Sequence, residues 1–485
     1  MALKVAVIGA GSIGFTRGIV RDILAVPEFR DTAFALTDIS EPNLNMVYTL
    51  LKRDVAAVEL PARLTATLDR REALTGANYV FSVVRVGGLE AFATDIDIPL
   101  KYGVDQCVGD TLCAGGIMYG QRNVPVILDF CKDIREVAVE GCLFLNHANP
   151  MAINTWAASK YGGARIVGLC HGVQGGHHLI ADAFGLKPSE VDITCAGINH
   201  QTWYIGIKHN GVDLTGKLLP ALENHPEYSR TEKVRIDIMK RFGYFSTESN
   251  GHLSEYVAWY RKRPEEIINW IDPQFSSWIH GETGGYLRAC TESRNWFETD
   301  FPKWMQEGAK PIGPEHRGSE HGSHIIEGLE TGRLYRGHFN VVNHGAITNL
   351  PDDAIVEVPG YVDANGINIP RVGDLPLGCA AVCNASIGVQ RLAVEAAVHG
   401  DDTLLRQAMM MDPLVGAVCD PPEIWQMVDE MLVAGERWLP QYENAIADAK
   451  RRLAAGKLIE PRANGAGATR QRVRTPEELG EARRA

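Results

Sequence analysis

The stretch KVAVIGAGSIGF, Lys4 to Phe15, decides how the start of the chain folds. A short β-branched run leads directly into three glycines spaced as Gly9-x-Gly11-x-x-Gly14. In a dinucleotide-binding turn the first glycine permits a tight turn, the second lets the backbone approach a pyrophosphate, and the third allows close packing of the next helix. The start of that helix presents unpaired N–H groups and a positive dipole end to phosphates. The cofactor-binding residues predicted here are Gly9, Gly11, Ser12, Ile13 and Gly14.

The residues that follow the glycines place them in the right context. GFTRGIVRDILAV is typical of a helix, and TAFALTD of a second strand that ends at Asp38. Asp38 is near the spacing of about 20 residues expected for an acid that holds a ribose hydroxyl. An acid there favours NAD over NADP, although Ser40 and Asn43 close by leave NADP open.

Strands and helices continue to alternate along the first part of the chain. YVFSVV (79–84), CLFLNHANP (142–150) and ARIVGLC (164–170) are strand-like, and helices are expected near 124–139 and from Asn154. Such repetition predicts an α/β fold with a parallel, doubly wound sheet. From about Gly197 the alternation breaks and an α+β region is expected. We predict an NAD-binding Rossmann domain over 1–196, an α+β substrate, metal and oligomerisation domain over 197–460, and a flexible or partner-dependent tail over 461–485.

Composition restricts the partners of the protein. The net charge of −12 gives no basic surface for nucleic acid, and hydrophobic residues at 45% with charged residues at 22% are typical of a globular protein. No signal segment or uninterrupted membrane-spanning run is evident, so a cytoplasmic protein without a membrane partner is expected.

The ten cysteines lack paired spacing and are expected to be free, buried thiols. The i, i+4 pair Cys379 and Cys383 is expected to be core rather than metal-binding.

Polar residues collect where predicted strands end, which is where ligands of such sheets bind. Asn146 and Asn149 end one strand, Cys170 ends the next, and VDITCAGINH ends in Asn199-His200. We expect Asn146 to contact the cofactor. A thiolate and an imidazole with open positions suit a divalent transition metal acting as a Lewis acid, so Cys170 and His200, delivered by two successive strands, are the predicted metal ligands. Spacing alone leaves open that both are ordinary core residues.

Several longer segments carry a family resemblance. They are VIGAGSIGF, IPLKYGV, CAGGIMYGQRN, NHANPMA, GLCHGV, AGINH, RFGYFSTES and NHGAITNLPDDAIVEVP, in this order. The chain resembles glycoside hydrolase family four, the NAD- and metal-dependent glycosidases, which depart from the usual two-carboxylate mechanism. The resemblance implies an architecture like that of lactate and malate dehydrogenases, a homodimer or homotetramer, and manganese as the metal.

The resemblance also implies redox chemistry used for hydrolysis. A sugar hydroxyl at C3 passes hydride to NAD, and the resulting ketone makes the C2 proton acidic. A base removes that proton while the metal holds the enediolate charge. The glycosidic oxygen is then eliminated, water adds, and the hydride returns.

Site residues follow from the resemblance. Asn149 is expected to bridge substrate and metal, and His171 either donates the leaving-group proton or binds a sugar hydroxyl. The C2 base is expected among Glu248, His252, Glu255 and Tyr256, with Tyr256 favoured. Asp110 belongs to a substrate loop and counts with His171 and Tyr256 as a catalytic candidate. The predicted substrate-binding residues are Asn149, Arg85, Asn199 and Glu248.

The identity of the sugar stays open. His171 resembles members that act on unphosphorylated α-glycosides, and the neighbourhood favours an α-galactoside. Gly172 resembles members that act on an α-glucoside or α-glucuronide, and an α-galacturonide is a further option. Two other functions remain: an NAD-dependent 2-hydroxyacid dehydrogenase, which would need no metal thiolate, and a non-catalytic NAD-binding sensor.

Overall fold

The fold was obtained as a computed structural model, which describes residues 3–275, 277–456, 458–460, 462 and 467–482. One sheet runs through the molecule, with strand order β10-β8-β7-β12-β11-β6-β5-β4-β1-β2-β3 and with β13 and β9 added to β12 and β8. The strands are β1 Lys4–Ile8, β2 Ala33–Thr37, β3 Arg63–Thr67, β4 Tyr79–Ser82, β5 Leu143–Asn146, β6 Arg165–Gly168, β7 Val191–Ile198, β8 Gln201–His209, β9 Val212–Asp213, β10 Phe245–Ser246, β11 Tyr335–Val342, β12 Ile355–Asp363 and β13 Gly366–Asn368.

Strands β1 to β6 form the parallel part of the sheet, which confirms the predicted α/β fold. Val5 and Val7 on β1 are completely buried, because helices cover both faces of a parallel sheet. Strand β3, with the sequence RLTAT, was not predicted. It forms the edge next to β2, and its polar, half-exposed residues give no continuous apolar run.

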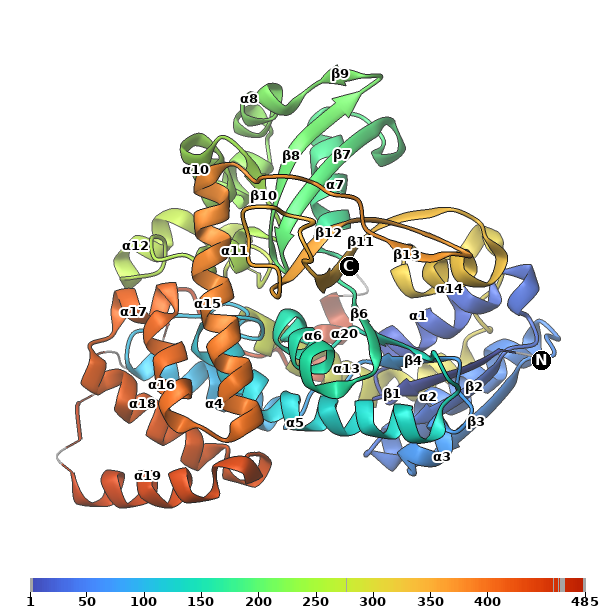
Figure 1. Ribbon diagram of the computed structural model, residues 1–485, viewed down its shortest axis with the longest axis horizontal. Coiled ribbons are helices and arrows are strands. Elements are labelled where there is room, and N and C mark those ends of the chain that lie inside the picture. Colours follow the sequence, from blue (N-terminus) through green and yellow to red (C-terminus); the bar gives the residue numbers. More distant parts are fainter. Residues whose placement is uncertain (1–2, 276, 457, 461, 463–466, 483–485) are drawn as a thin grey trace.

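Helices of very different lengths lie around the sheet (Figure 1). They are α1 Ile13–Leu24, α2 Glu41–Ala57, α3 Arg70–Leu74, α4 Gly88–Lys101, α5 Cys113–Val137, α6 Met151–Ala157, α7 Gly172–Ala183, α8 Leu218–Asn224, α9 Tyr228–Thr231, α10 Lys233–Phe242, α11 Asn250–Tyr256, α12 Pro264–Trp270, α13 Gly285–Gln306, α14 His321–Thr331, α15 Leu377–His399, α16 Asp402–Met411, α17 Pro413–Val418, α18 Pro421–Ala434, α19 Glu443–Ala455 and α20 Pro476–Ala482. Short turns of 3₁₀ helix occur at Pro27–Phe29, Pro188–Glu190, Thr215–Lys217, Pro273–Phe275, Pro314–His316, Glu436–Trp438 and Pro440–Tyr442, and a π-helical turn at Ala158–Gly162.

The second half of the sheet is antiparallel. Strand β11 pairs with β6 and β12, and β12 pairs with β7, all in antiparallel fashion. Strands β6 and β7 are successive in the chain but are not neighbours in the sheet, because β11 and β12, which come much later in the chain, lie between them. The sheet crosses the predicted boundary at residues 196 and 197 without a break, and the division into domains stays a prediction.

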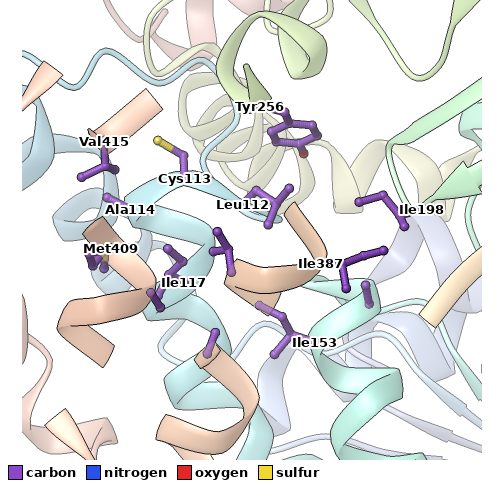
Figure 2. Close-up of a cluster of buried hydrophobic side chains, with 14 of the residues drawn as sticks. Leu112, Cys113, Ala114, Ile117, Ile153, Ile198, Tyr256, Ile387, Met409 and Val415 are labelled. Carbon is purple, nitrogen blue, oxygen red and sulfur yellow. The ribbon is translucent and has the colours of Figure 1, made fainter. Parts of the chain in front are cut away.

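The largest apolar core lies between the second half of the sheet and helices from both halves of the chain (Figure 2). Leu112 immediately precedes α5 and Ile117 lies near its start, and both lie near Ile153 of α6 and Ile387 of α15. Helix α15 is long and apolar enough to cross a membrane by length and composition alone. Half of that stretch is buried inside the protein, where α15 packs on α5, α6 and α16, as the core helix of a globular protein does.

The described part of the predicted tail contacts the body of the protein. The N–H of Ala468 donates to the buried Asp105 carboxylate at 2.9 Å. Arg474 forms an ion pair of 2.7 Å with Glu292 on α13, and Arg470 forms another with Asp97 on α4. Residues 461, 463–466 and 483–485 of the predicted tail lie outside the described residues.

Candidate active site

The glycine turn joins β1 to α1 at the carboxyl edge of the parallel strands. Gly9 has a φ of +85°, which favours glycine, and the N–H of Gly11 donates to Asp38 Oδ2 at 2.8 Å. A Cβ on Gly11 would lie 2.8 Å from that of Asn43, so only glycine fits there. Ser12 precedes the first residue of α1, Ile13. The turn and Asp38 therefore fit a dinucleotide.

The structure gives the surroundings of Gly14 and Asn146, two positions of the predicted cofactor site. A Cβ on Gly14 would meet nothing within 4 Å, so the expected close helix packing at Gly14 is wrong. The side chain of Asn146 is buried and bonded within its own turn, accepting from the N–H of Ala148 and donating to its carbonyl oxygen. Asn146 thus shapes the turn after β5.

Three potential metal donors converge from three different strand ends. Cys170 follows β6, His200 follows β7 and Glu248 follows β10, and their donor atoms all lie within 4.8 Å of one another. Glu248 Oε2 lies 2.8 Å from His200 Nε2 and 3.6 Å from Cys170 Sγ. The predicted ligands Cys170 and His200 do meet, and Glu248, predicted as a substrate-binding residue, joins them.

The charges in this cluster are strongly coupled. Burial, together with the nearby Glu248 carboxylate, raises the pKa of the Cys170 thiol to about 12. Burial alone would lower the pKa of His200, but Glu248 raises it well above its usual value. Burial would raise the pKa of Glu248, but the charges of His200 and His252 lower it. A sulfur, an imidazole nitrogen and a carboxylate oxygen at this separation fit a divalent transition metal.

A cavity of about 160 Å³ opens beside these donors. Its polar lining side chains are Asp110, His147, Asn149, Cys170, His171, His200, Glu248 and His252. Phe15, which follows the glycine turn, also lines the cavity, together with Trp278 and Tyr286. The cofactor turn, the metal donors and a space for a small ligand therefore share one location.

Asp110 organises one wall of the cavity. Its carboxylate accepts from Asn149 Nδ2 at 3.2 Å, from Thr111 Oγ1 at 2.9 Å and from Arg85 at 3.2 Å. The Arg85 guanidinium lies over the rings of Phe92, Tyr119 and Tyr286. Arg85 therefore contacts Asp110 and is not itself among the residues that line the cavity.

His171 lies on another wall of the cavity, at the start of α7. Its Nε2 lies 2.6 Å from Glu320 Oε1, and this hydrogen bond raises the pKa of His171. His147 stacks on His171 with 6.1 Å between ring centroids. Glu320 and His147 were not predicted. Glu320 follows an irregular loop about 150 positions from His171 in the chain, and no sequence pattern links the two.

The four candidate bases occupy different environments. Glu255 accepts the backbone N–H groups of Cys107, Val108 and Gly109, which is a structural role. Tyr256 is buried and does not line the cavity; its hydroxyl lies 3.3 Å from His200 Nδ1. His252 does line the cavity, its Nδ1 contacts Ser249 at 2.9 Å, and its Nε2 has no hydrogen-bond partner among the described residues.

Asn199, predicted to bind substrate, lies behind the site. It is completely buried and its Nδ2 donates to Glu357 at 3.4 Å. Burial raises the pKa of Glu357 to about 7. Asn199 therefore contacts Glu357 and is not among the residues that line the cavity.

Comparison with known proteins places this geometry in a family. Residues 4–186 match the sequence model of the family 4 glycosyl hydrolases, and residues 195–415 match that of their C-terminal domain. An alpha-galactosidase of Rhizobium meliloti is 60% identical over 99% of this chain and 97% of its own. An alpha-galactosidase of Bacillus subtilis is 33% identical over 91% of this chain and 100% of its own. A 6-phospho-alpha-glucosidase from gut microorganisms, solved with NAD and glucose-6-phosphate, superposes with a TM-score of 0.73 at 27% identity, covering 90% of this chain and 99% of that one.

Proposed function

The chain belongs to the family 4 glycosyl hydrolases and is therefore a glycosidase, and we propose that it hydrolyses neutral, unphosphorylated α-galactosides. Membership confirms the resemblance drawn from the sequence and sets aside both the 2-hydroxyacid dehydrogenase and the non-catalytic sensor. One observation supports the proposed mechanism above all: Cys170, His200 and Glu248 converge on the cavity that Asp110, Asn149 and His171 also line.

Two bound groups complete this proposal. The glycine turn and Asp38 hold NAD, and Cys170 and His200, with Glu248 beside them, hold a divalent transition metal that we assign as manganese. When bound, NAD would supply a hydride acceptor for sugar C3, and the metal would supply a Lewis acid. Asn149, fixed by Asp110, orients the sugar hydroxyls next to the metal ligands.

We assign the leaving-group proton to His171. The Glu320 carboxylate holds the His171 ring in place and favours its protonated form, so that the ring can deliver a proton to the departing oxygen. The imidazoles of His147 and His321 stack near the ring, and because burial lowers their pKa values, they are neutral at pH 7 and place no second positive charge beside it.

We assign removal of the C2 proton to His252 in place of Tyr256. His252 lines the cavity, and its Nε2 has no hydrogen-bond partner among the described residues, so this nitrogen is free to accept a proton. The Tyr256 hydroxyl contacts His200 Nδ1 and so holds the imidazole that binds the metal.

The charge of the cavity supports a neutral substrate. A sugar in it faces the Asp110 and Glu248 carboxylates, while the guanidinium of Arg85 is already paired with Asp110. A uronate would place its carboxylate beside these two acids, and none of the described side chains that line the cavity is an arginine or a lysine that could pair with it, so we rank α-glucuronides and α-galacturonides below neutral sugars. Among neutral sugars, the relative at 60% identity supports galactose.

The remaining assignments rest on the sequence. The net charge of −12 supports a protein without nucleic-acid partners. We propose that it acts in the cytoplasm as a homodimer or homotetramer, with domains over 1–196 and 197–460 and a tail over 461–485.

A panel of nitrophenyl glycosides tests the proposal. The α-galactoside, α-glucoside, α-glucuronide and α-galacturonide are each assayed with NAD and Mn²⁺, and again with one of the two omitted. We expect the α-galactoside to be cleaved fastest, and only when both are present. Equal rates without NAD would contradict the mechanism, and a preferred uronide would contradict the substrate.

A further inference from the structure

A second group of donor side chains lies beside the proposed metal ligands. Atoms of His147, His171 and Glu320 that could bind a metal all lie within 4.8 Å of one another. They come from three separate segments: the turn after β5, the start of α7 and the loop before α14. Because Cys170 and His171 are consecutive, the backbone directs one side chain into each group.

The second group contains buried polar atoms that the protein leaves unsatisfied. Nδ1 and Nε2 of His147 and Oε2 of Glu320 are buried and have no hydrogen-bond partner among the described residues. The ion pair between His171 Nε2 and Glu320 Oε1, at 2.6 Å, satisfies only part of the group. Each unsatisfied buried polar atom costs about 1–3 kcal/mol, so three at one place indicate that they bind something.

The surroundings hold the donors in position. The rings of Phe15 and Phe81 pack on His147 at 5.6 and 5.9 Å between centroids, which fixes the imidazole plane against an apolar wall. Two imidazole nitrogens and one carboxylate oxygen, with a further position open to the cavity, form a donor set that Zn²⁺ prefers.

We propose that His147, His171 and Glu320 form a second divalent-cation site of the zinc type, separate from that of Cys170, His200 and Glu248. Its occupancy inhibits the enzyme, because His171 lines the cavity and a cation bound to its ring obstructs the approach of the departing oxygen. The binding claim is independent of the proposed function; only the inhibition depends on it.

Counting bound cations tests the site. Metal-free, full-length protein is titrated with Zn²⁺ by calorimetry and with Co²⁺ by absorption, where a thiolate-to-cobalt band reports Cys170 alone. The wild type is expected to bind two equivalents. Glu320→Gln and His147→Ala each bind one and keep the thiolate band, which also reports an intact fold. Cys170→Ser binds one and loses the band.

Matched controls are Glu315→Gln, an exposed acid in the same loop, and His178→Ala, an exposed histidine on α7. Both are expected to bind two equivalents. A single equivalent of bound cation in the wild type, or two equivalents in both Glu320→Gln and His147→Ala, overturns the site.

For the inhibition, Zn²⁺ is added to enzyme saturated with Mn²⁺ and NAD. Loss of the His147 or Glu320 side chain should raise the inhibitory Zn²⁺ concentration at least about tenfold, and an unchanged concentration in both variants overturns the inhibitory role.

Discussion

Glu248 Oε2 lies 2.8 Å from His200 Nε2, although the two residues follow strands that do not pair with each other. Since the same oxygen also lies 3.6 Å from Cys170 Sγ, the carboxylate links both predicted metal ligands. We therefore expect substitutions of these residues to change the affinity of the protein for the metal.

Cys170→Ser should weaken Mn²⁺ binding by more than about 100-fold and abolish turnover, because the thiolate is lost while the fold is kept. Glu248→Gln should weaken binding by about 10- to 100-fold, because an amide replaces a charged oxygen. Calorimetric titration with Mn²⁺ measures both. Cys290→Ser, outside the cluster, is the control and should bind like the wild type. Normal affinity in Cys170→Ser would refute its role as a ligand.

Proton removal should depend on His252 more than on Tyr256. His252→Asn should slow exchange of the sugar C2 proton with solvent by about 10²- to 10⁴-fold, the usual effect of losing a general base. Tyr256→Phe removes the contact of the hydroxyl with His200 and should lower Mn²⁺ affinity with a smaller effect on exchange. Exchange followed by NMR separates the two, and the reverse order would restore Tyr256 as the base.

His338 should make the protein less stable in acid. Burial, with His321 and Arg336 nearby, lowers its pKa to about 3 in the folded state, against about 6.5 in an unfolded chain. Between these values only the unfolded chain binds the proton, so the free energy of unfolding falls as pH drops from about 6.5 to about 3, by up to about 1.4 kcal/mol per pH unit.

In His338→Gln this part of the pH dependence should disappear. Urea unfolding at pH 5 and pH 7 measures it, and the exposed His178→Gln serves as control. Equal pH dependence in His338→Gln and the wild type would show that His338 is not held neutral.

The tail should support the cavity wall. Arg474 is paired with Glu292 on α13, the helix that also carries Tyr286 of the cavity. Arg474→Gln should raise KM about 2- to 5-fold, which corresponds to about 0.5–1 kcal/mol for a half-exposed ion pair. Arg472→Gln is the matched control, because Arg472 pairs with Glu478 inside the tail itself. An unchanged KM after deletion of residues 467–485 would show that the tail does not support the cavity.

The sequence was informative where function depends on short local patterns. The glycine turn, Asp38 and the strand ends at Cys170 and His200 each follow an apolar run, and this order predicts both the parallel sheet and the location of the ligands. The family resemblance then supplied the chemistry.

The rest depends on contacts between distant segments. Insertion of β11 and β12 between β6 and β7 leaves no trace in local periodicity. Glu320 contacts His171 from an irregular loop. Arg85 forms an ion pair with Asp110, so its guanidinium is not available to bind a substrate carboxylate. Likewise, His252 and Tyr256 lie on one short helix, and only the folded structure separates the side chain that lines the cavity from the one that contacts His200.

The most direct measurement of the proposed mechanism is the isotopic content of the released sugar. The α-galactoside is hydrolysed in D₂O with NAD and Mn²⁺, and the product is analysed by NMR. Removal and return of the C2 proton predict deuterium at C2 of the product galactose. A product that forms at the normal rate and keeps its C2 hydrogen in full would contradict the account.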